Sequence, residues 1–317
     1  MSKQKYSIGV DIGGTYIKVG AASEEGTIIH KTRVDTRADE GPEIVIRQII
    51  KGVKRILEKN NSDIEGIGIG APGSVIKEKG MVLNPPNLPG WKRVELGPRI
   101  AQEFNTRVSV DNDANAAAVG EMIFGAGKDL NHFLMITLGT GVGGGVVINR
   151  KVFGGELGAA GEIGHTTVDY KGRKCNCGSY GCLETYIGNN YLIKHLLREL
   201  KKNDDSKIHE LINGDYSELS TKIVHEAAQM KDELAIKTII SSGRILGYGI
   251  ASTVNLLDMS NVVIGGGVAG FGKLLFDSVE SAIKERVLTP LKPRIKVIPA
   301  ELKNEAGIKG ASALIFC

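Results

Sequence analysis

The chain has 317 residues, of which 42% are hydrophobic and 24% charged, and its formal net charge is +4. This length suffices for two domains or one large one, and the composition is ordinary for a globular protein. Basic residues are spread along the chain without interleaved aromatic residues, and no apolar run reaches the length of a membrane span. We therefore expect neither a nucleic-acid partner nor a membrane partner.

The first segment predicts a strand from Tyr6, a glycine turn and a second strand, which leaves no room for a signal peptide. The turn contains Asp11, Gly13, Gly14 and Thr15. Glycines let a backbone approach a phosphate closely, and successive turn amides form an anion-binding nest. Thr15 can add a hydroxyl donor, and Asp11 is suited to bind Mg²⁺ through water. A plain hairpin turn with a capping aspartate explains the same residues equally well.

The next elements alternate between helix and strand. Apolar residues at helical spacing predict a helix over 46–57, and a short apolar strand follows over 64–70. The stretch 84–91 is rich in proline, which removes backbone donors, so we predict a loop there. A strand over 108–111 leads into a helix that begins at Asp113 with a carboxylate in its first turn. Asp113 can be the N-cap of that helix, because aspartate is favoured there.

A second strand, glycine turn and strand follow over 133–148 and repeat the plan of the first segment. The turn, 138–145, consists mostly of glycine and threonine, whereas a structural turn needs one or two such residues. It is not a Walker loop, because no Gly-Lys-Ser/Thr follows, nor a dinucleotide fingerprint, because a strand follows the glycines. Two separated loops that close on one nucleotide are the plan of an actin-like ATPase.

The remaining sequence predicts further α/β layers. Residues 155–184 are glycine-rich and irregular, and 186–257 are mostly helical with a polar break at 203–206. A strand over 262–267 runs into three glycines and a helix to about residue 287. A last strand over 295–299 and a closing helix over 306–316 complete the chain.

The cysteines indicate a metal site rather than a disulfide framework. Of four cysteines, Cys175, Cys177 and Cys182 fall close together, and Cys317 is separate. A Cys-x-Cys pair can direct two thiolates at one ion, and His165, ten residues upstream, gives a Cys₃His set suited to Zn²⁺. Three buried thiols and a core histidine are the alternative. Four protein ligands make a closed, structural site, and reduced cysteines predict a cytoplasmic protein.

Four motifs occur together: Asp11-x-Gly-Gly-Thr15, Asp111-Asn-Asp-Ala-Asn115, Gly161-Glu-Ile-Gly-His165 and Cys175-x-Cys-Gly-x-x-Gly-Cys-x-Glu184. Over essentially its whole length the chain resembles the ROK family of sugar kinases and repressors. The resemblance implies an α/β, two-domain actin-like ATPase (ribonuclease H-like) fold with the active site in the interdomain cleft. A small domain over 1–110 and a large one over 111–303 are expected. The zinc-binding segment would be 155–184, and the closing helix, about 304–317, would pack back on the small domain.

The resemblance also implies roles for individual residues. Asp113 would be the general base that accepts the proton of a sugar hydroxyl, a role compatible with a helix cap. Sugar ligands would be Gly73, Asn87, Asn112, Asp113, Glu162, His165 and Glu184, with His165 also on zinc. ATP would be bound by Asp11, Gly13, Gly14, Thr15, Lys18, Gly139, Thr140, Gly141, Gly265, Gly266 and Gly267. For the last three, a turn that needs positive φ is nearly as good an explanation.

The implied activity is ATP-dependent phosphorylation of the 6-hydroxyl of glucose, with Mg²⁺ as cofactor and Zn²⁺ as structural ion. N-acetylmannosamine, N-acetylglucosamine and fructose are the alternative sugars, because kinases for them share most of these motifs. The stretch from Asn87 to Trp91 is longer than the form associated with glucose, so stacking of Trp91 on the sugar stays open beside a place in the core. Repressors of the family carry an N-terminal helix-turn-helix, for which the strand near Tyr6 leaves no room. Dimers or tetramers are expected.

Overall fold

The computed structural model describes residues 5–59, 63–85 and 87–317. Pro86, part of the predicted loop over 84–91, lies outside the described residues. The strands are β1 (Tyr6–Ile12), β2 (Tyr16–Ser23), β3 (Ile28–Asp35), β4 (Ile64–Ala71), β5 (Ser74–Ile76), β6 (Met81–Leu83), β7 (Arg93–Glu95), β8 (Val108–Asn112), β9 (Phe133–Leu138), β10 (Val142–Ile148), β11 (Lys151–Val152), β12 (Asn261–Gly265) and β13 (Lys296–Pro299).

The helices are α1 (Pro42–Leu57), α2 (Leu96–Phe104), α3 (Asp113–Phe124), α4 (Glu184–Ile187), α5 (Asn189–Leu200), α6 (Ile208–Leu211), α7 (Thr221–Gln229), α8 (Glu233–Leu257), α9 (Lys273–Arg286) and α10 (Ala306–Ala313). Each strand and helix predicted from the sequence has a counterpart among these elements. Within the described ranges, no helix is both long and apolar enough to cross a membrane.

Strands β3, β2, β1, β4 and β8 form one sheet in this order. β1 pairs antiparallel with β2 and parallel with β4, and β4 pairs parallel with β8. The carboxyl ends of β1, β4 and β8 therefore meet at one edge. Among the described residues, a second sheet has the order β11-β10-β9-β12-β13, and the short strands β5, β6 and β7 form a third.

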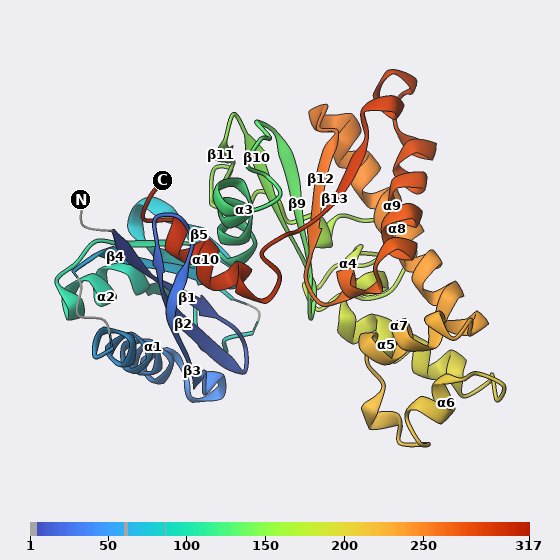
Figure 1. Cartoon of the computed structure of the whole chain (residues 1–317), viewed down its shortest axis with the longest axis horizontal. Coiled ribbons are helices and arrows are strands. Elements are labelled where there is room, and N and C mark those ends of the chain that lie inside the picture. Colours follow the sequence, from blue (N-terminus) through green and yellow to red (C-terminus); the bar gives the residue numbers. More distant parts are fainter. Residues whose placement is uncertain (1–4, 60–62, 86) are drawn as a thin grey trace. The chain divides into compact units, whose positions relative to one another are not determined.

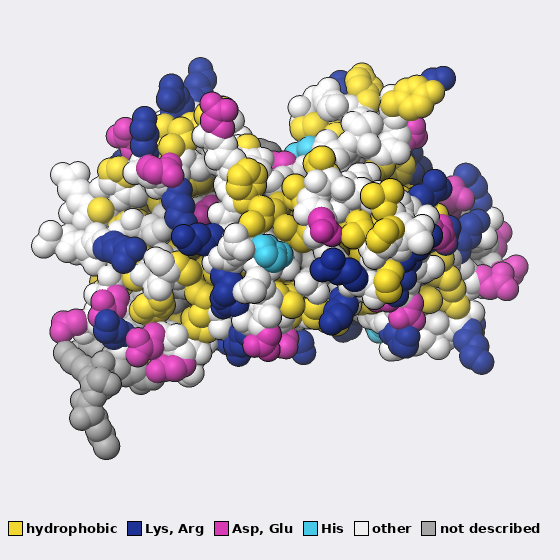
Figure 2. Space-filling model, turned by 90° about the horizontal axis from the view of Figure 1, so that it is seen from above, with side chains coloured by type: hydrophobic (Ala, Val, Ile, Leu, Met, Phe, Trp, Pro, Cys, Tyr) yellow, Lys and Arg dark blue, Asp and Glu magenta, His cyan; other side chains and the backbone are white. Residues whose placement is uncertain are grey.

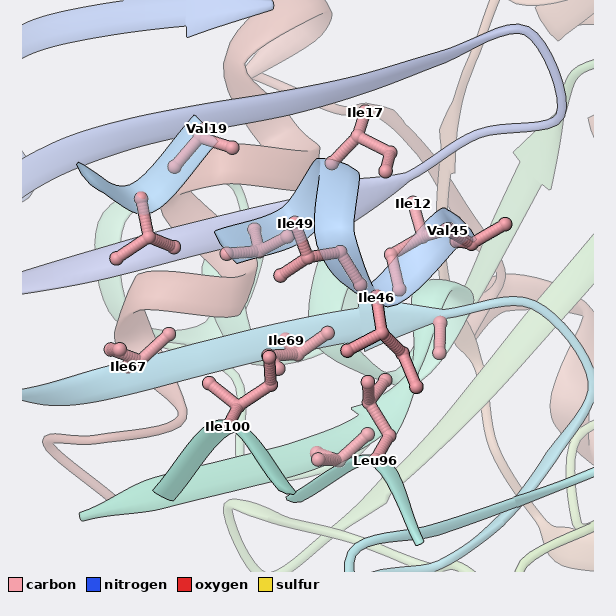
Figure 3. Packing of buried hydrophobic residues seen from close by; sticks show 14 of the residues in the cluster. Ile12, Ile17, Val19, Val45, Ile46, Ile49, Ile67, Ile69, Leu96 and Ile100 are labelled. Carbon is pink, nitrogen blue, oxygen red and sulfur yellow. The ribbon is translucent and has the colours of Figure 1, made fainter. Parts of the chain in front are cut away.

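One face of the first sheet is apolar. Alternate side chains of a strand point to the same face, and these alternate positions hold isoleucine and valine. Ile8, Val10 and Ile12 of β1 are buried in one cluster with Ile67 and Ile69 of β4. Helices α1 and α2 cover this cluster with a row of isoleucine and leucine side chains, as Figure 3 shows. The helical spacing seen in the sequence over 46–57 is the face of α1 that packs here.

The other face of this sheet is covered by α10. A methyl group built on Gly9 would stand 2.0 Å from the carbonyl oxygen of Ile308, and one on Gly68 would stand 1.8 Å from that of Ala311. The helix backbone therefore lies directly on the strands, which only glycine permits at these two positions. Figure 1 shows α10, in red, beside the blue strand β1, although these elements come from opposite ends of the chain.

The segment that leads into α10 is fixed by a buried glutamate. Glu121, at the end of α3, is fully buried. Its carboxylate accepts hydrogen bonds from the backbone N–H groups of Ala126, at 2.8 Å, Glu301, at 3.1 Å, and Leu302, at 2.9 Å. Three donors on one carboxylate satisfy a charge that would otherwise be costly to bury.

The described residues group into two compact units. Unit 1 comprises residues 1–135, 145–161 and 300–317, and unit 2 comprises 136–144 and 162–299. Residues 111–135 thus group with the N-terminal segment, whereas the predicted domain boundary lies at residue 110. Compactness alone does not define a domain that folds or moves by itself, so the predicted domains of 1–110 and 111–303 stay a prediction.

Charged side chains of both signs share the surface. Figure 2 shows Lys and Arg side chains interspersed with Asp and Glu on the face that it displays. Ion pairs between described residues include Lys54 with Glu103 at 2.6 Å, between α1 and α2. On this face the charges are mixed in the way that is typical of a solvated surface.

Candidate functional site

The edge formed by the carboxyl ends of the parallel strands collects the acidic motif residues of unit 1. Asp11 of β1 is the register partner of Gly70 in β4, and Gly70 is the register partner of Asp111 in β8. Since neighbouring strands lie about 4.8 Å apart, the backbones of the two aspartates are roughly 10 Å apart across this edge. In α/β proteins this is the edge at which ligands bind. Two motifs that are distant in sequence are thus brought to one place.

The first glycine loop is a tight turn held by the segment after β3. The N–H of Gly13 donates to the carbonyl of Tyr16 at 3.1 Å, and the N–H of Thr36 donates to the carbonyl of Thr15 at 2.9 Å. The hydroxyl of Thr36 donates to the carbonyl of Gly13 at 2.6 Å, and Thr36 is fully buried. Gly14 and Thr15 remain exposed and available to a ligand. No sequence signal had singled out Thr36.

Asp11 is held by two further contacts. Its Oδ2 atom accepts a hydrogen bond from Lys18 Nζ at 3.3 Å, across the β1–β2 pair in which the two residues are register partners. The same oxygen lies against Gly307, where a built methyl group would stand 2.2 Å from it. Asp11 and Lys18, both predicted to bind ATP, therefore form one charged pair at the loop.

The N-cap of α3 is Asn112, not Asp113. The Oδ1 atom of Asn112 accepts from the backbone N–H groups of Ala114, at 2.9 Å, and Asn115, at 3.3 Å. This corrects the sequence interpretation of Asp113 as a possible cap. Asp113 is the first residue of the helix and is exposed, so its carboxylate lies at the positive end of the helix dipole.

Asp111 has a structural position. It is buried, and its Oδ1 atom accepts from the N–H of Asn112 at 2.8 Å and from Asn115 Nδ2 at 2.9 Å. Its Oδ2 atom lies 3.3 Å from Lys77 Nζ. These partners fix the strand end that leads into Asp113.

Asn112 and Gly73, both predicted sugar ligands, contact each other. The Nδ2 group of Asn112 donates to the carbonyl of Gly73 at 3.0 Å. Gly73 has φ +83°, and a methyl group there would stand 2.7 Å from Pro85 Cα, so glycine is required where the turn between β4 and β5 packs against the proline loop. The polar atoms of Asn112 are thus used in structure, and its predicted contact with sugar stays a prediction.

Asn87 lies beside the first glycine loop. A methyl group built on Gly14 would be 3.8 Å from Asn87 Cβ, an ordinary contact distance. Trp91 is 3% exposed and belongs to the apolar cluster of unit 1. The tryptophan therefore has a place in the core, and the alternative that it stacks on a sugar finds no support in its burial.

The second glycine loop, 139–141, and the three glycines at 265–267 both lie in unit 2. The N–H of Gly139 donates to the carbonyl of Gly141 at 3.0 Å, and both Gly139 and Thr140 are exposed. Gly266, at φ +94°, packs on the end of β9, where a methyl group would stand 2.3 Å from the carbonyl oxygen of Leu138. The loops 139–141 and 265–267, both predicted to bind ATP, are therefore adjacent.

The predicted zinc ligands come together. The ligand atoms of His165, Cys175, Cys177 and Cys182 all lie within 4.8 Å of one another. The Sγ atoms of Cys177 and Cys182 are 3.7 Å apart, and Cys175 Sγ is 3.8 Å from His165 Nδ1. Thiolates and imidazole around a tetrahedral Zn²⁺ lie about 2.0–2.3 Å from the ion, which puts them at about this mutual spacing. The donor set and its geometry fit Zn²⁺.

The glycines of the cysteine motif explain its spacing. The N–H of Cys175 donates to the carbonyl of Ser179 at 2.8 Å, which closes a tight turn. Gly178 has φ +94° and Gly181 has φ +66°, and a methyl group on Gly181 would collide with the Asp169 backbone at 1.6 Å. The chain must turn sharply between Cys177 and Cys182, and glycine permits it.

The surroundings of this cluster disfavour the thiolate form of Cys175 and of Cys182. Burial raises the pKa of Cys175, and burial raises the pKa of Cys182 to about 12. A hydrogen bond from the Ser179 backbone lowers the pKa of Cys177. Loss of hydration raises the pKa of the nearby Glu162 carboxyl, which His165 opposes and the charge of Glu184 reinforces. A bound cation would lower the pKa of these thiols and favour their thiolate form.

Glu184 lies next to both the cluster and the second glycine loop. Its Oε1 atom is 4.0 Å from Cys175 Sγ, and its Oε2 atom accepts from the N–H of Val142 at 3.0 Å. Glu184 is a predicted sugar ligand, and no pattern in the sequence indicates its contact with the loop.

Comparisons with known proteins cover nearly the whole chain. The model of the ROK family matches residues 7–316. The glucokinase of Thermotoga maritima is 34% identical over 97% of this chain and 96% of that protein. The crystal structure of a ROK family glucokinase from Streptomyces griseus in complex with glucose and AMPPNP superposes with a TM-score of 0.87, at 35% identity over 98% of both chains. The xylose repressor of Caldicellulosiruptor bescii is 30% identical over 98% of this chain and 77% of the repressor.

Proposed function

The chain belongs to the ROK family, and we propose that it is an ATP-dependent hexose kinase that phosphorylates the 6-hydroxyl of glucose. The family resemblance and the α/β two-domain actin-like ATPase fold predicted from the four motifs are confirmed. The proposal of glucose as the substrate rests on the similarity to a solved family member in complex with glucose and AMPPNP, at 35% identity over 98% of both chains. The match to a repressor covers 77% of the repressor, which leaves part of that protein without a counterpart in the match.

The proposed chemistry is an in-line phosphoryl transfer. The carboxylate of Asp113 accepts the proton of the 6-hydroxyl as that oxygen bonds to the γ-phosphorus of ATP. The bond from the γ-phosphorus to the bridging oxygen breaks, and ADP leaves with the electron pair. Asp113 suits this role because it is exposed and because it lies at the start of α3, next to the strand end of β8.

Charge neutralisation falls to the glycine loops and a cation. The hydroxyl of Thr15 and the backbone amides of the exposed residues Gly14 and Thr140 would donate to phosphate oxygens. Asp11 would hold Mg²⁺ through water, and Lys18 beside it supplies a positive charge. The remaining proposed ATP residues are Gly13, Gly139, Gly141, Gly265, Gly266 and Gly267.

The proposed sugar residues are Gly73, Asn87, Asn112, Asp113, Glu162, His165 and Glu184. Nδ1 of His165 lies 3.8 Å from Cys175 Sγ, and we propose that its other ring nitrogen serves a sugar hydroxyl. We propose a structural Zn²⁺ held by His165, Cys175, Cys177 and Cys182, which would fix the segment that carries Glu162 and Glu184. Zinc does no chemistry in this scheme, since four protein ligands close its coordination.

The decisive experiment measures ADP release over a panel of sugars: glucose, mannose, fructose, N-acetylglucosamine and N-acetylmannosamine. We expect the highest kcat/KM with glucose and ATP. A preference for an acetylated sugar would overturn glucose and retain the kinase, and absence of ADP release with every sugar would overturn the kinase. Replacing ATP by other nucleoside triphosphates or polyphosphate identifies the donor. The oligomeric state and the cytoplasmic location stay predictions.

A further inference from the structure

We infer that Glu184 is a positioning residue for the nucleotide loop 139–141, in addition to its proposed contact with sugar. The inference deepens the proposed function and rests on it. Glu184 belongs to the cysteine motif, and the family resemblance implies that it binds sugar. On this inference it also contributes to the affinity for ATP.

The contact with the loop is direct. Glu184 Oε2 accepts a hydrogen bond from the N–H of Val142 at 3.0 Å, immediately after the loop. The same oxygen occupies the space where a side chain at Gly141 would begin, since a methyl group there would stand 2.1 Å from it. The glycine is thus required for the carboxylate to reach the backbone.

The residues after Glu184 hold the rest of the loop. The N–H of Asn189 donates to the carbonyl of Gly139 at 3.0 Å, and the N–H of Asn190 lies 3.5 Å from the carbonyl of Thr140. Gly188 packs on Thr140, where a methyl group would stand 3.2 Å from the carbonyl oxygen. Every residue of the loop therefore touches the segment 184–190.

This arrangement leaves the loop amides in a defined orientation. The Gly139 and Thr140 carbonyls point to the 184–190 segment. The exposed side of the turn therefore presents backbone N–H groups to solvent, where a phosphate would bind. Removing the carboxylate frees the Val142 N–H and one end of the loop. The loop must then be ordered by the nucleotide itself, which lowers nucleotide affinity.

A sugar-free binding measurement separates this role from a contact with sugar. We expect Glu184→Ala to bind MgADP about tenfold more weakly than the wild type by isothermal titration calorimetry without sugar, the loss typical of a removed charged hydrogen bond. Glu184→Gln keeps an acceptor for the Val142 N–H, so its MgADP affinity should stay within about twofold of the wild type. If the alanine variant does not fold, Glu184→Asp withdraws the carboxylate by one methylene and should weaken MgADP binding in the same direction.

The matched control is Glu162→Ala, which removes the other glutamate proposed to bind sugar. It should weaken glucose binding and leave sugar-free MgADP affinity unchanged. A double-mutant cycle with Gly141→Ala gives a second readout: the methyl group displaces the carboxylate, so adding Glu184→Ala should cost little more.

Equal MgADP affinity of the wild type and Glu184→Ala would overturn the positioning role and leave the kinase assignment standing. Full additivity in the cycle with Gly141→Ala would also overturn it. A wild type that binds no MgADP and phosphorylates no hexose would instead overturn the proposed function.

Discussion

The carboxylate of Asp11 lies directly against the Cα atom of Gly307, the second residue of α10. A methyl group on this glycine would stand 2.2 Å from Asp11 Oδ2 and 2.4 Å from its Cγ. The Asp11 carboxylate, which we propose to hold Mg²⁺, can therefore occupy this position only because residue 307 has no side chain. Asp11 is confined between this helix and Lys18, with which it forms a hydrogen bond at 3.3 Å.

Gly307→Ala should displace the Asp11 carboxylate and weaken the response to Mg²⁺. We expect the Mg²⁺ concentration for half-maximal activity to rise about tenfold or more, the effect of one misplaced charged group. Alanine is favoured over glycine within a helix by about 0.5–1 kcal/mol, so a loss of helix propensity cannot explain such a change. The Mg²⁺ titration of ADP release measures it.

The matched control is Gly270→Ala, because a methyl group at Gly270 meets nothing within 4 Å among the described residues. It should leave the Mg²⁺ titration unchanged. A Gly307→Ala variant with the titration of the wild type would show that Asp11 tolerates displacement or does not serve the cation.

Asp113→Asn should abolish most turnover without loss of binding. The amide keeps the size of the carboxylate but cannot accept the proton of the sugar hydroxyl, and general-base catalysis contributes about 10²–10⁴-fold. The measurements are kcat together with glucose and MgADP affinities by calorimetry. Turnover within a few-fold of the wild type would remove Asp113 from the role of base.

Cys177→Ser should lower metal content and stability. Serine is a weak zinc ligand, and loss of one of four ligands leaves an incomplete tetrahedral site. Plasma mass spectrometry should find about one zinc per chain in the wild type and much less in the variant, with a lower thermal midpoint. Cys317→Ser, outside the cluster, should retain both. Wild-type protein purified without zinc would contradict the proposed site.

Glu121→Ala should destabilise unit 1 strongly. The substitution leaves the N–H groups of Ala126, Glu301 and Leu302 without their acceptor, at a cost of about 2–5 kcal/mol for several buried donors. Urea unfolding measures the free energy. Glu58→Ala, at an exposed position after α1, should change it by less than about 0.5 kcal/mol. Equal stability of the two variants would show that the buried carboxylate contributes little.

Local patterns predicted those elements and site residues whose signals lie within a few residues. The isoleucines of α1 are spaced for one face, and the glycines between Cys177 and Cys182 sit where positive φ is needed. The strands β5, β6 and β7, with three residues each, are too short for a period to show, and they were not predicted. Asp113 was considered as a cap because aspartate suits that position, yet Asn112 is better placed at the strand end.

Contacts between distant segments could not be predicted in this way. Gly9 and Gly68 alternate with isoleucine and valine in their strands, and nothing local tells that α10 lies on them. The contacts of Asp11 with Gly307 and of Glu184 with Val142 depend on which elements pack together, which is a property of the whole fold. The four motifs succeeded because they identify a family in which that packing is already specified.

The position of α10 has a consequence for the order in which the protein is made. Ser7 in β1 donates its hydroxyl to the carbonyl of Ser312 at 3.0 Å, across 305 residues of chain. During translation, the glycine face of the first sheet stays uncovered until this helix leaves the ribosome, whereas the elements of unit 2 have already emerged. The packing of this face is therefore completed only after unit 2 has been synthesised. An mRNA that lacks the codons for α10 would yield a chain whose first-made segment cannot complete its packing.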